Sequence, residues 1–252
     1  MLETHDLTKS FKGLMALKRH HLRVGPGEIV GVIGPNGSGK STLFNLISGF
    51  LRPSQGGVRF EGHEISRLAP ATIARLGIAR TFQGTRLFKN LSVLENVRAG
   101  AQLRYPVNLV EAVSGWGRAR AHQTASEGRA WGLLELVGLA EVAAQPAGSL
   151  PYGNQRRLEI ARALATGPKL LMMDEPAAGL DSHETAALLQ LIRRIRDQFE
   201  LAVILIEHDM DLVMNLCERI QVLAYGETIA EGTPAEVQAD PRVREAYLGG
   251  VA

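Results

Sequence analysis

Short apolar segments alternate with stretches of helical periodicity along most of the chain. The segments 28–33, 169–173 and 201–206 are rich in Ile, Val, Leu and Met and have the length of buried strands. Residues 42–48 predict a helix after the first segment, and residues 182–199, with apolar side chains about every 3.6 positions, predict a second helix capped by Ser182. This alternation predicts an α/β fold with a mostly parallel core sheet.

Two regions depart from this rhythm. Residues 1–27 and 57–65 contain short strands bounded by Gly and Pro, which predict an N-terminal antiparallel β subdomain. His20 and His21 fall in one of these strands, where we expect them to be half exposed. Residues 92–148 are helical but irregular and predict an inserted helical subdomain. We expect residues 1–252 to form a single domain that contains this insertion.

The charge balance and the cysteine count narrow the classes of function. The 28 Lys and Arg residues nearly cancel the 26 Asp and Glu residues, and the net charge of +2 gives no support to a nucleic-acid partner. Cys217 is the only cysteine, which excludes an intramolecular disulfide and fits a reducing compartment. No apolar run approaches the ~20 residues of a membrane-spanning helix, and the N-terminus has no signal region. We therefore expect a soluble, cytoplasmic protein.

Residues 34–41 fit the phosphate-loop motif G-x-x-x-x-G-K-[ST] in full. The loop follows a predicted strand and opens a predicted helix, where backbone N–H groups and the helix N-terminus attract phosphate. Lys40 is expected to bind the β and γ phosphates, Ser41 to offer its hydroxyl to Mg²⁺, and Thr42 to help hold the neighbouring phosphates. The candidate nucleotide-binding residues of this segment are Gly34, Asn36, Gly37, Ser38, Gly39, Lys40, Ser41 and Thr42.

A second chemical signal follows the apolar segment 169–173, where Asp174 and Glu175 stand in sequence. The carboxyl edge of a parallel sheet is where α/β proteins bind their ligands. Asp174 can hold Mg²⁺ through water, and Glu175 can polarise the water that attacks the γ-phosphorus. Many strands end in acids, so the alternative for Glu175 is a solvated side chain; the pattern becomes specific only together with the phosphate loop.

Three further motifs complete an ordered set. Gln83 stands in Thr81-Phe82-Gln83, the loop 150–157 precedes a predicted helix, and His208 follows the segment 201–206. Together with the phosphate loop, the acidic strand end and the loop 178–181, this order resembles the ATP-binding-cassette (ABC) ATPases over the whole chain.

A closer resemblance lies in the segments around these motifs. The helical insertion, the tail 245–249 and the segments 156–162 and 206–210 are similar to the longer of the two ATPase subunits of branched-chain amino-acid importers. The resemblance implies an ATPase that energises such an importer. It also implies that residues 92–160, within the single ABC ATPase domain, form a helical subdomain that carries the signature loop.

The resemblance assigns roles to the matching residues. Glu175 activates water, His208 contacts the γ-phosphate, and Gln83 reaches the metal and the attacking water. Phe11 matches the aromatic residue that stacks on adenine, although a lone aromatic after a strand often packs in the core instead. ATP and Mg²⁺ are the implied cofactors. The implied Mg²⁺ ligands are Ser41, Gln83 and Asp174.

The signature loop departs from the usual Leu-Ser-Gly-Gly-Gln form. Here it is Leu150-Pro151-Tyr152-Gly153-Asn154, so Pro151 removes a serine hydroxyl and a backbone N–H. A proline suits the first turn of a helix and leaves the fold intact. Two outcomes stay open for the contact with a partner's nucleotide: the missing hydroxyl weakens it, or the Gly153 N–H, Asn154 and the helix dipole suffice. Tyr152, Gly153 and Asn154 are expected to bind that nucleotide.

The resemblance also implies partners. Each of two ATP molecules lies between the phosphate loop of one subunit and the signature loop of the other, so a second ABC ATPase subunit, or a second copy of this chain, is expected. Two transmembrane permease subunits and a periplasmic or extracellular binding protein acting through them complete an importer, and no nucleic acid is expected. The chain then lies peripherally on the cytoplasmic face of the inner (cell) membrane, with Phe88 and Leu91 facing a permease.

Other functions stay open at this point. ABC ATPases of urea, amide or lipopolysaccharide-export transporters share most of these motifs. A soluble ABC ATPase of DNA repair or translation typically carries long coiled-coil insertions or two cassettes, whereas no heptads are sustained here. A P-loop kinase would not need His208 or the loop 150–154. The transported substrate cannot be read from these residues.

Overall fold

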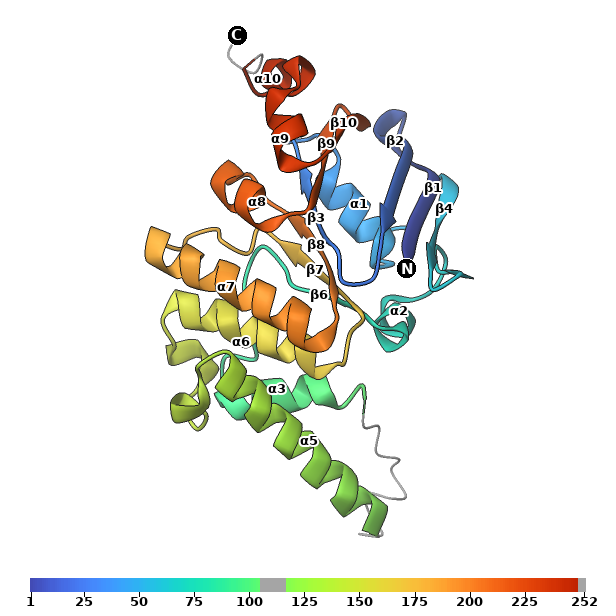
Figure 1. Ribbon diagram of the computed structural model, residues 1–252. Helices are drawn as coiled ribbons and strands as arrows, with labels where there is room; N and C mark the ends of the chain where they lie inside the picture. Colours follow the sequence, from blue (N-terminus) through green and yellow to red (C-terminus); the bar gives the residue numbers. More distant parts are fainter. Residues whose placement is uncertain (105–116, 249–252) are drawn as a thin grey trace.

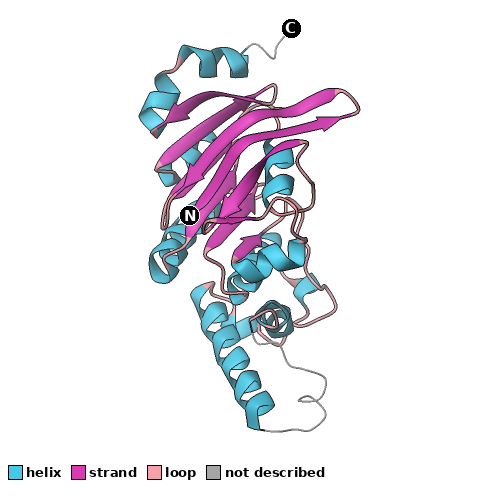
Figure 2. Cartoon of the chain, turned by 90° about the vertical axis from the view of Figure 1, so that its right-hand side faces the viewer, coloured by secondary structure: helices cyan, strands magenta, loops and turns pink. Residues whose placement is uncertain are grey.

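The computed structural model describes residues 1–104 and 117–248, with the backbone alone for residues 117–123 and Leu248. Its centre is a six-stranded sheet in the order β10-β9-β3-β8-β7-β6 (Figures 1 and 2). All neighbouring strands in this sheet are parallel except β10, which is antiparallel to β9. The strands are β3 (Ile29–Ile33), β6 (Ile78–Arg80), β7 (Leu170–Asp174), β8 (Ala202–Ile206), β9 (Arg219–Ala224) and β10 (Glu227–Gly232).

A second, antiparallel sheet in the order β2-β1-β4-β5 faces the first one. Helix α1 (Lys40–Ile47) lies between the two sheets (Figure 1). Its apolar face, including the fully buried Leu43, Phe44 and Leu46, fills the core between them. The strands are β1 (Leu2–Phe11), β2 (Leu14–Val24), β4 (Gln55–Phe60) and β5 (His63–Glu64). The predicted fold class, a mostly parallel core sheet with an N-terminal antiparallel part, is confirmed.

Helices cover the remaining surfaces of the core sheet. Helices α3, α5 and α6 pack against one another beyond the β6 edge, at the lower end of Figure 1. They and α7 share one apolar core with the outer face of the sheet. The helices are α2 (Pro70–Leu76), α3 (Val93–Ala101), α5 (Gly117–Leu136), η1 (Ala140–Val142), η2 (Ala147–Ser149), α6 (Tyr152–Ala165), α7 (Ser182–Phe199), α8 (Met210–Leu216), α9 (Pro234–Ala239) and α10 (Pro241–Leu248).

The start of α7 differs from the prediction by one residue. Asp181, not Ser182, is the N-cap, because its side chain accepts a hydrogen bond of 2.8 Å from the Glu184 N–H. The Glu184 carboxylate in turn accepts a hydrogen bond of 3.2 Å from the Asp181 N–H. This capping box satisfies two of the N–H groups that a helix start leaves unpaired. Asp181 therefore occupies the N-cap position, and Ser182 is the first helical residue.

A buried histidine connects the two sheets. His21 is exposed, but the expectation of a half-exposed His20 is wrong, because only 1% of its surface is exposed. Its Nε2 lies 2.6 Å from Oε1 of Gln221 on β9, and its Nδ1 lies 3.2 Å from Oγ1 of Thr4 on β1. The pKa of His20 is lowered to about 4, chiefly by burial and also by the neighbouring His21, against the opposing effects of Gln221 and Glu231. His20 is therefore a neutral hydrogen-bonding link at neutral pH.

This histidine predicts an acid-sensitive stability. In the unfolded chain His20 binds a proton below a pKa of about 6.5, whereas in the folded protein it does so only below about 4. The unfolded state thus binds more protons in this window, and the free energy of unfolding falls as the pH drops through it, by about 3 kcal/mol at most. Urea denaturation of wild type and His20→Gln between pH 7 and pH 4 should show a shallower pH slope for the variant. The exposed His63→Gln is the control, and equal slopes for wild type and His20→Gln would refute the prediction.

Candidate nucleotide site

The phosphate loop joins β3 to α1 and depends on glycine at two close approaches. Gly34 has a φ of 146°, and a Cβ there would lie 2.0 Å from the carbonyl oxygen of Leu223. Gly39, at a φ of 111°, would place a Cβ 2.6 Å from the carbonyl oxygen of Ala16. No other residue type combines these backbone angles with this lack of space. The loop is therefore held between β2 and β9 with its backbone curled.

The polar groups of this loop fit a polyanion. Nζ of Lys40 donates to the carbonyl oxygens of Gly34 at 2.7 Å and Pro35 at 3.0 Å. Burial lowers the pKa of Lys40, while the nearby Glu175 and Asp174 oppose this effect. A lysine ammonium has three protons to donate, and a phosphate oxygen is a stronger acceptor than a carbonyl. The buried Oγ of Ser38 has no hydrogen-bond partner within the described part of the chain.

Three predicted catalytic residues meet at the end of β7. Nε2 of Gln83 donates to Oε2 of Glu175 at 2.8 Å, and Nδ1 of His208 lies 3.9 Å from Oε1 of the same carboxylate. These residues follow β6, β7 and β8, which are neighbours in the sheet, so their carboxyl ends bring the three side chains together. Glu175 itself has a φ of 48°, in the left-handed region that costs a non-glycine residue free energy. Such strain is typical of residues held in place for function.

Oxygen donors suited to Mg²⁺ line one hollow beside this carboxylate. The hollow has a volume of about 560 Å³, and its lining includes Ser41, Gln83 and Asp174. Hydroxyl, amide and carboxylate oxygens are the ligands that Mg²⁺ prefers, and it usually takes one or two carboxylates and completes its shell with phosphates and water. Within residues 1–104 and 117–248, no three His, Cys, Asp or Glu side chains cluster as a self-contained metal site. The donor set therefore fits a metal that arrives with a nucleotide.

Two charged residues that sequence reasoning missed support the site. Nη2 of Arg80 donates to Oδ2 of Asp174 at 2.9 Å. Oε1 of the buried Glu207 accepts from the N–H of Ala177 at 2.9 Å, and Oε2 accepts from the N–H of His208 at 3.2 Å; burial raises the pKa of Glu207. Each residue ends or directly follows an apolar strand beside a recognised motif, and that position is the signal that could have identified it.

The segment after β6 is also fixed to α6. Nη1 of Arg156 donates to the carbonyl oxygen of Phe82 at 2.8 Å, and Nη2 donates to the carbonyl oxygen of Gln83. The Phe82 N–H donates to Glu159 at 3.3 Å, and Arg156 and Glu159 form a buried ion pair at 3.4 Å. Burial raises the pKa of Glu159, while the Phe82 N–H and Arg156 oppose this effect. These contacts from α6 therefore hold the backbone of Phe82 and Gln83 in place.

The signature loop forms the start of α6. Tyr152, Gly153 and Asn154 open α6, and none of them lines the hollow that holds Ser41 and Asp174. Pro151 is the N-cap residue and makes no side-chain capping bond. Gly153 packs against α7, because a Cβ there would lie 2.4 Å from Oε1 of Glu184.

Phe11 ends β1 and is 42% exposed. It is therefore not a core residue, and its ring lies 5.1 Å from Nζ of Lys9. An exposed ring is free to stack on a base, so its contact with adenine stays a prediction.

A phosphate loop between a parallel sheet and a helix, with an acidic strand end beside it, defines a P-loop nucleoside-triphosphatase. The family model of the ABC transporter matches residues 17–178, and a model described as the branched-chain amino acid ATP-binding cassette transporter matches residues 227–252. The chain therefore belongs to the ABC transporter family, as one of its ATP-binding proteins. The predicted ATPase activity and ATP binding are confirmed.

Relatives and solved structures support this assignment over the whole chain. The branched-chain amino acid transport ATP-binding protein BraF of Pseudomonas aeruginosa is 43% identical, with 99% of this chain and 98% of BraF covered. LivG of Escherichia coli strain K12, of the same description, is 41% identical over the same shares. A nucleotide-free ATP-binding cassette superposes with a TM-score of 0.85 at 33% identity, covering 98% of both chains. A dimeric cassette bound to ADP and Pi reaches 0.79 at 28% identity, covering 93% of this chain and 99% of the other.

Proposed function

We propose that this protein hydrolyses ATP to drive the import of branched-chain amino acids. The observation that carries the proposal is the meeting of Gln83, Glu175 and His208 beside the phosphate loop. Full-length similarity to BraF and LivG supports the substrate class. No described helix is long and apolar enough to cross a membrane, and we place the chain peripherally on the cytoplasmic face of the cell membrane.

Each group has a defined task in the proposed reaction. The loop from Gly34 to Thr42, with the ammonium of Lys40, binds the phosphates. Ser41, Asp174 and Gln83 would hold Mg²⁺, which when bound neutralises charge on the β and γ phosphates. The buried hydroxyl of Ser38 also donates to the phosphates. The backbone N–H groups of Asn36, Gly37 and Gly39 donate to them as well.

The hydrolytic step itself needs a base and an orienting group. Glu175 takes a proton from the attacking water, and the Gln83 amide, 2.8 Å from its carboxylate, orients the carboxylate and the water. His208, whose Nδ1 lies 3.9 Å from Oε1 of Glu175, donates to the γ-phosphate. Phe11, at the end of β1 in the second sheet, stacks on adenine.

We propose that the working unit is a dimer with a second ABC ATPase subunit or a second copy of this chain. Tyr152, Gly153 and Asn154 then contact the nucleotide bound to the other subunit, through the N-terminus of α6. None of these three residues lines this chain's own hollow, as the arrangement requires. Residues 92–160 form the helical subdomain, within a single domain of residues 1–252, and carry this loop. The part of this subdomain at residues 105–116 lies outside the described residues.

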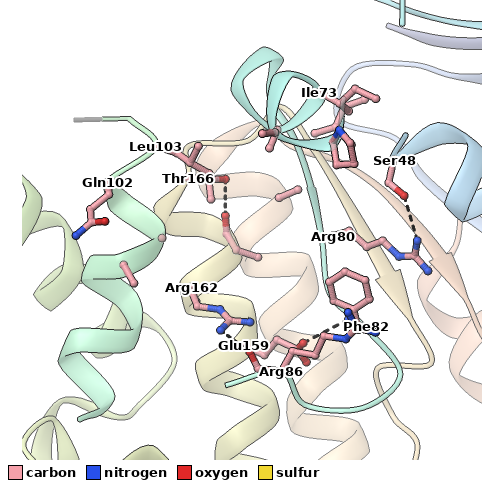
Figure 3. Close-up of a pocket in the computed structure, with 18 of the residues that line it drawn as sticks. Ser48, Ile73, Arg80, Phe82, Arg86, Gln102, Leu103, Glu159, Arg162 and Thr166 are labelled. Carbon is pink, nitrogen blue, oxygen red and sulfur yellow. Dashed lines mark hydrogen bonds between the residues drawn. The ribbon is translucent and has the colours of Figure 1, made fainter. Parts of the chain in front are cut away.

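An apolar groove fits the role of permease dock (Figure 3). It has a volume of about 600 Å³ and lies between α2, α3 and the segment after β6. Phe50 and Phe88 line it and are 54% and 53% exposed, an unusual exposure for aromatic side chains. Leu91 is 38% exposed but does not line the groove. We propose that one of the two permease subunits docks here and that a binding protein acts through the permeases.

Cross-linking tests the dock. Phe88→Cys should form disulfide or maleimide cross-links with a permease in the assembled complex, because its side chain opens into the groove. The natural Cys217 is buried and contributes little background. Tyr225→Cys, at a position that is 85% exposed in the turn after β9, is the matched control. Cross-links at Tyr225 and none at Phe88 would contradict the proposed dock.

The transport assay decides the proposed function. Proteoliposomes that contain the chain, its partner ATPase and both permeases should take up labelled leucine only with ATP and the binding protein. The Glu175→Gln variant of the complex is the control for ATP-driven transport. Uptake of urea or an amide in place of leucine would overturn the proposed substrate class and leave the ATPase assignment intact.

A further inference from the structure

Arg80 lies at the junction of three elements of the nucleotide site. It ends β6, pairs in register with Met172 of β7, and its side chain is only 8% exposed. Figure 3 shows it pointing toward Ser48, next to the ring of Phe82. It lines both the hollow that holds Asp174 and the apolar groove.

One guanidinium joins the phosphate-loop helix to the acidic strand. Nη2 donates to Oδ2 of Asp174 at 2.9 Å, while Nη1 donates to Oδ1 of Asn45 at 2.7 Å and to Oγ of Ser48 at 3.1 Å. Asn45 of α1 and Ser48, which caps α1, fix the position of Nη1, and because the guanidinium is planar and rigid they also fix the direction of Nη2.

Two aromatic rings pack near the guanidinium of Arg80. Its Cζ lies 5.4 Å from the ring centre of Phe44 and 5.0 Å from that of Phe82. Both distances are within the range of cation–π attraction. Packing and hydrogen bonds therefore fix a single orientation of Arg80.

We propose that Arg80 is a positioning residue that fixes the orientation of the Asp174 carboxylate, which would help to hold Mg²⁺, through its hydrogen bond to Oδ2. Ligating carboxylates are in turn hydrogen-bonded, and such outer partners orient the ligand. The fixed fork of arginine suits this task, whereas the ammonium of lysine is a point charge on a flexible stem. The proposal rests on the assignment of Mg²⁺ to Asp174 in the proposed function. It does not depend on what occupies the groove.

The test measures metal-dependent nucleotide binding without turnover. A fluorescent ATP analogue is titrated onto the purified full-length chain in EDTA and at increasing Mg²⁺ concentration. Arg80→Met should raise the Mg²⁺ concentration for half-maximal binding about 10- to 100-fold and leave the affinity in EDTA unchanged. Arg80→Lys, which keeps the charge and loses the fork, should shift it in the same direction. Arg75→Met, an exposed arginine on α2, is the control and should behave as wild type.

A purely structural role gives a different result. If Arg80 only ties α1 to β7, Arg80→Met lowers the melting temperature and weakens binding equally in EDTA and Mg²⁺, which overturns the proposal. If Arg80→Met does not fold, Ser48→Ala removes one group that orients Arg80 and should give a smaller shift of the same sign. An unchanged Mg²⁺ dependence in Ser48→Ala and Arg80→Lys also overturns it.

The Asp174→Asn variant distinguishes failure of the proposed role of Arg80 from failure of the assignment of Mg²⁺ to Asp174. An Asp174→Asn variant with wild-type Mg²⁺ dependence removes Asp174 from the metal site, and both proposals fail. A shift in Asp174→Asn without a shift in the Arg80 variants leaves the metal assignment in place and refutes the role of Arg80 alone.

Discussion

Replacing Glu175 by Gln should reduce the rate of ATP hydrolysis about 10²- to 10⁴-fold while ATP binding is retained. The amide has the shape of the carboxylate, and its oxygen can still accept the 2.8 Å hydrogen bond from Gln83. It cannot take a proton from water, so only the chemical step is lost. The measurement is steady-state phosphate release together with the equilibrium affinity for ATP.

The control for Glu175 is an exposed glutamate on helix α5. Glu135→Gln changes an exposed carboxylate on α5 in the same way and should hydrolyse ATP at the wild-type rate. Hydrolysis by Glu175→Gln within about threefold of wild type would exclude this residue as the general base, since loss of a base costs far more.

Replacing Lys40 by Ala should weaken ATP binding itself. The Lys40 ammonium, at the start of α1, donates to the carbonyl oxygens of Gly34 and Pro35 in the phosphate loop. From this position its protons can reach the oxygens of a bound phosphate. A hydrogen bond between charged groups contributes about 1.5–3 kcal/mol, which corresponds to about 10- to 150-fold weaker binding. Calorimetric titration with ATP measures this loss directly.

An exposed lysine serves as the control for Lys40→Ala. Lys169→Ala removes an exposed lysine, paired with Glu61 at 2.9 Å, and should leave ATP affinity unchanged. An ATP affinity of Lys40→Ala equal to wild type would contradict the role of the loop as a phosphate cradle. A loss of binding in Lys40→Ala and of hydrolysis in Glu175→Gln assigns the two groups to separate steps.

Much of the nucleotide site could be predicted from the sequence because its parts are local. The loop 34–41 carries its own backbone requirements, since glycines at fixed offsets permit the angles and close approaches that Gly34 and Gly39 show. The acidic pair at 174–175 follows its apolar strand directly. Apolar periodicity likewise located α7, although the choice between Asp181 and Ser182 as cap depended on which side chain reached the N–H of Glu184.

The tertiary structure alone decided which distant residues meet. Gln83, Glu175 and His208 converge because β6, β7 and β8 are adjacent in the sheet, and no local pattern determines strand order. Arg80 reaches Asp174 for the same reason, across neighbouring strands 94 residues apart in sequence. His20 is buried because the second sheet packs against β9, a contact that the alternation along β2 does not encode. Backbone geometry is set by near neighbours in the chain, whereas these contacts are set by how the sheets and helices pack.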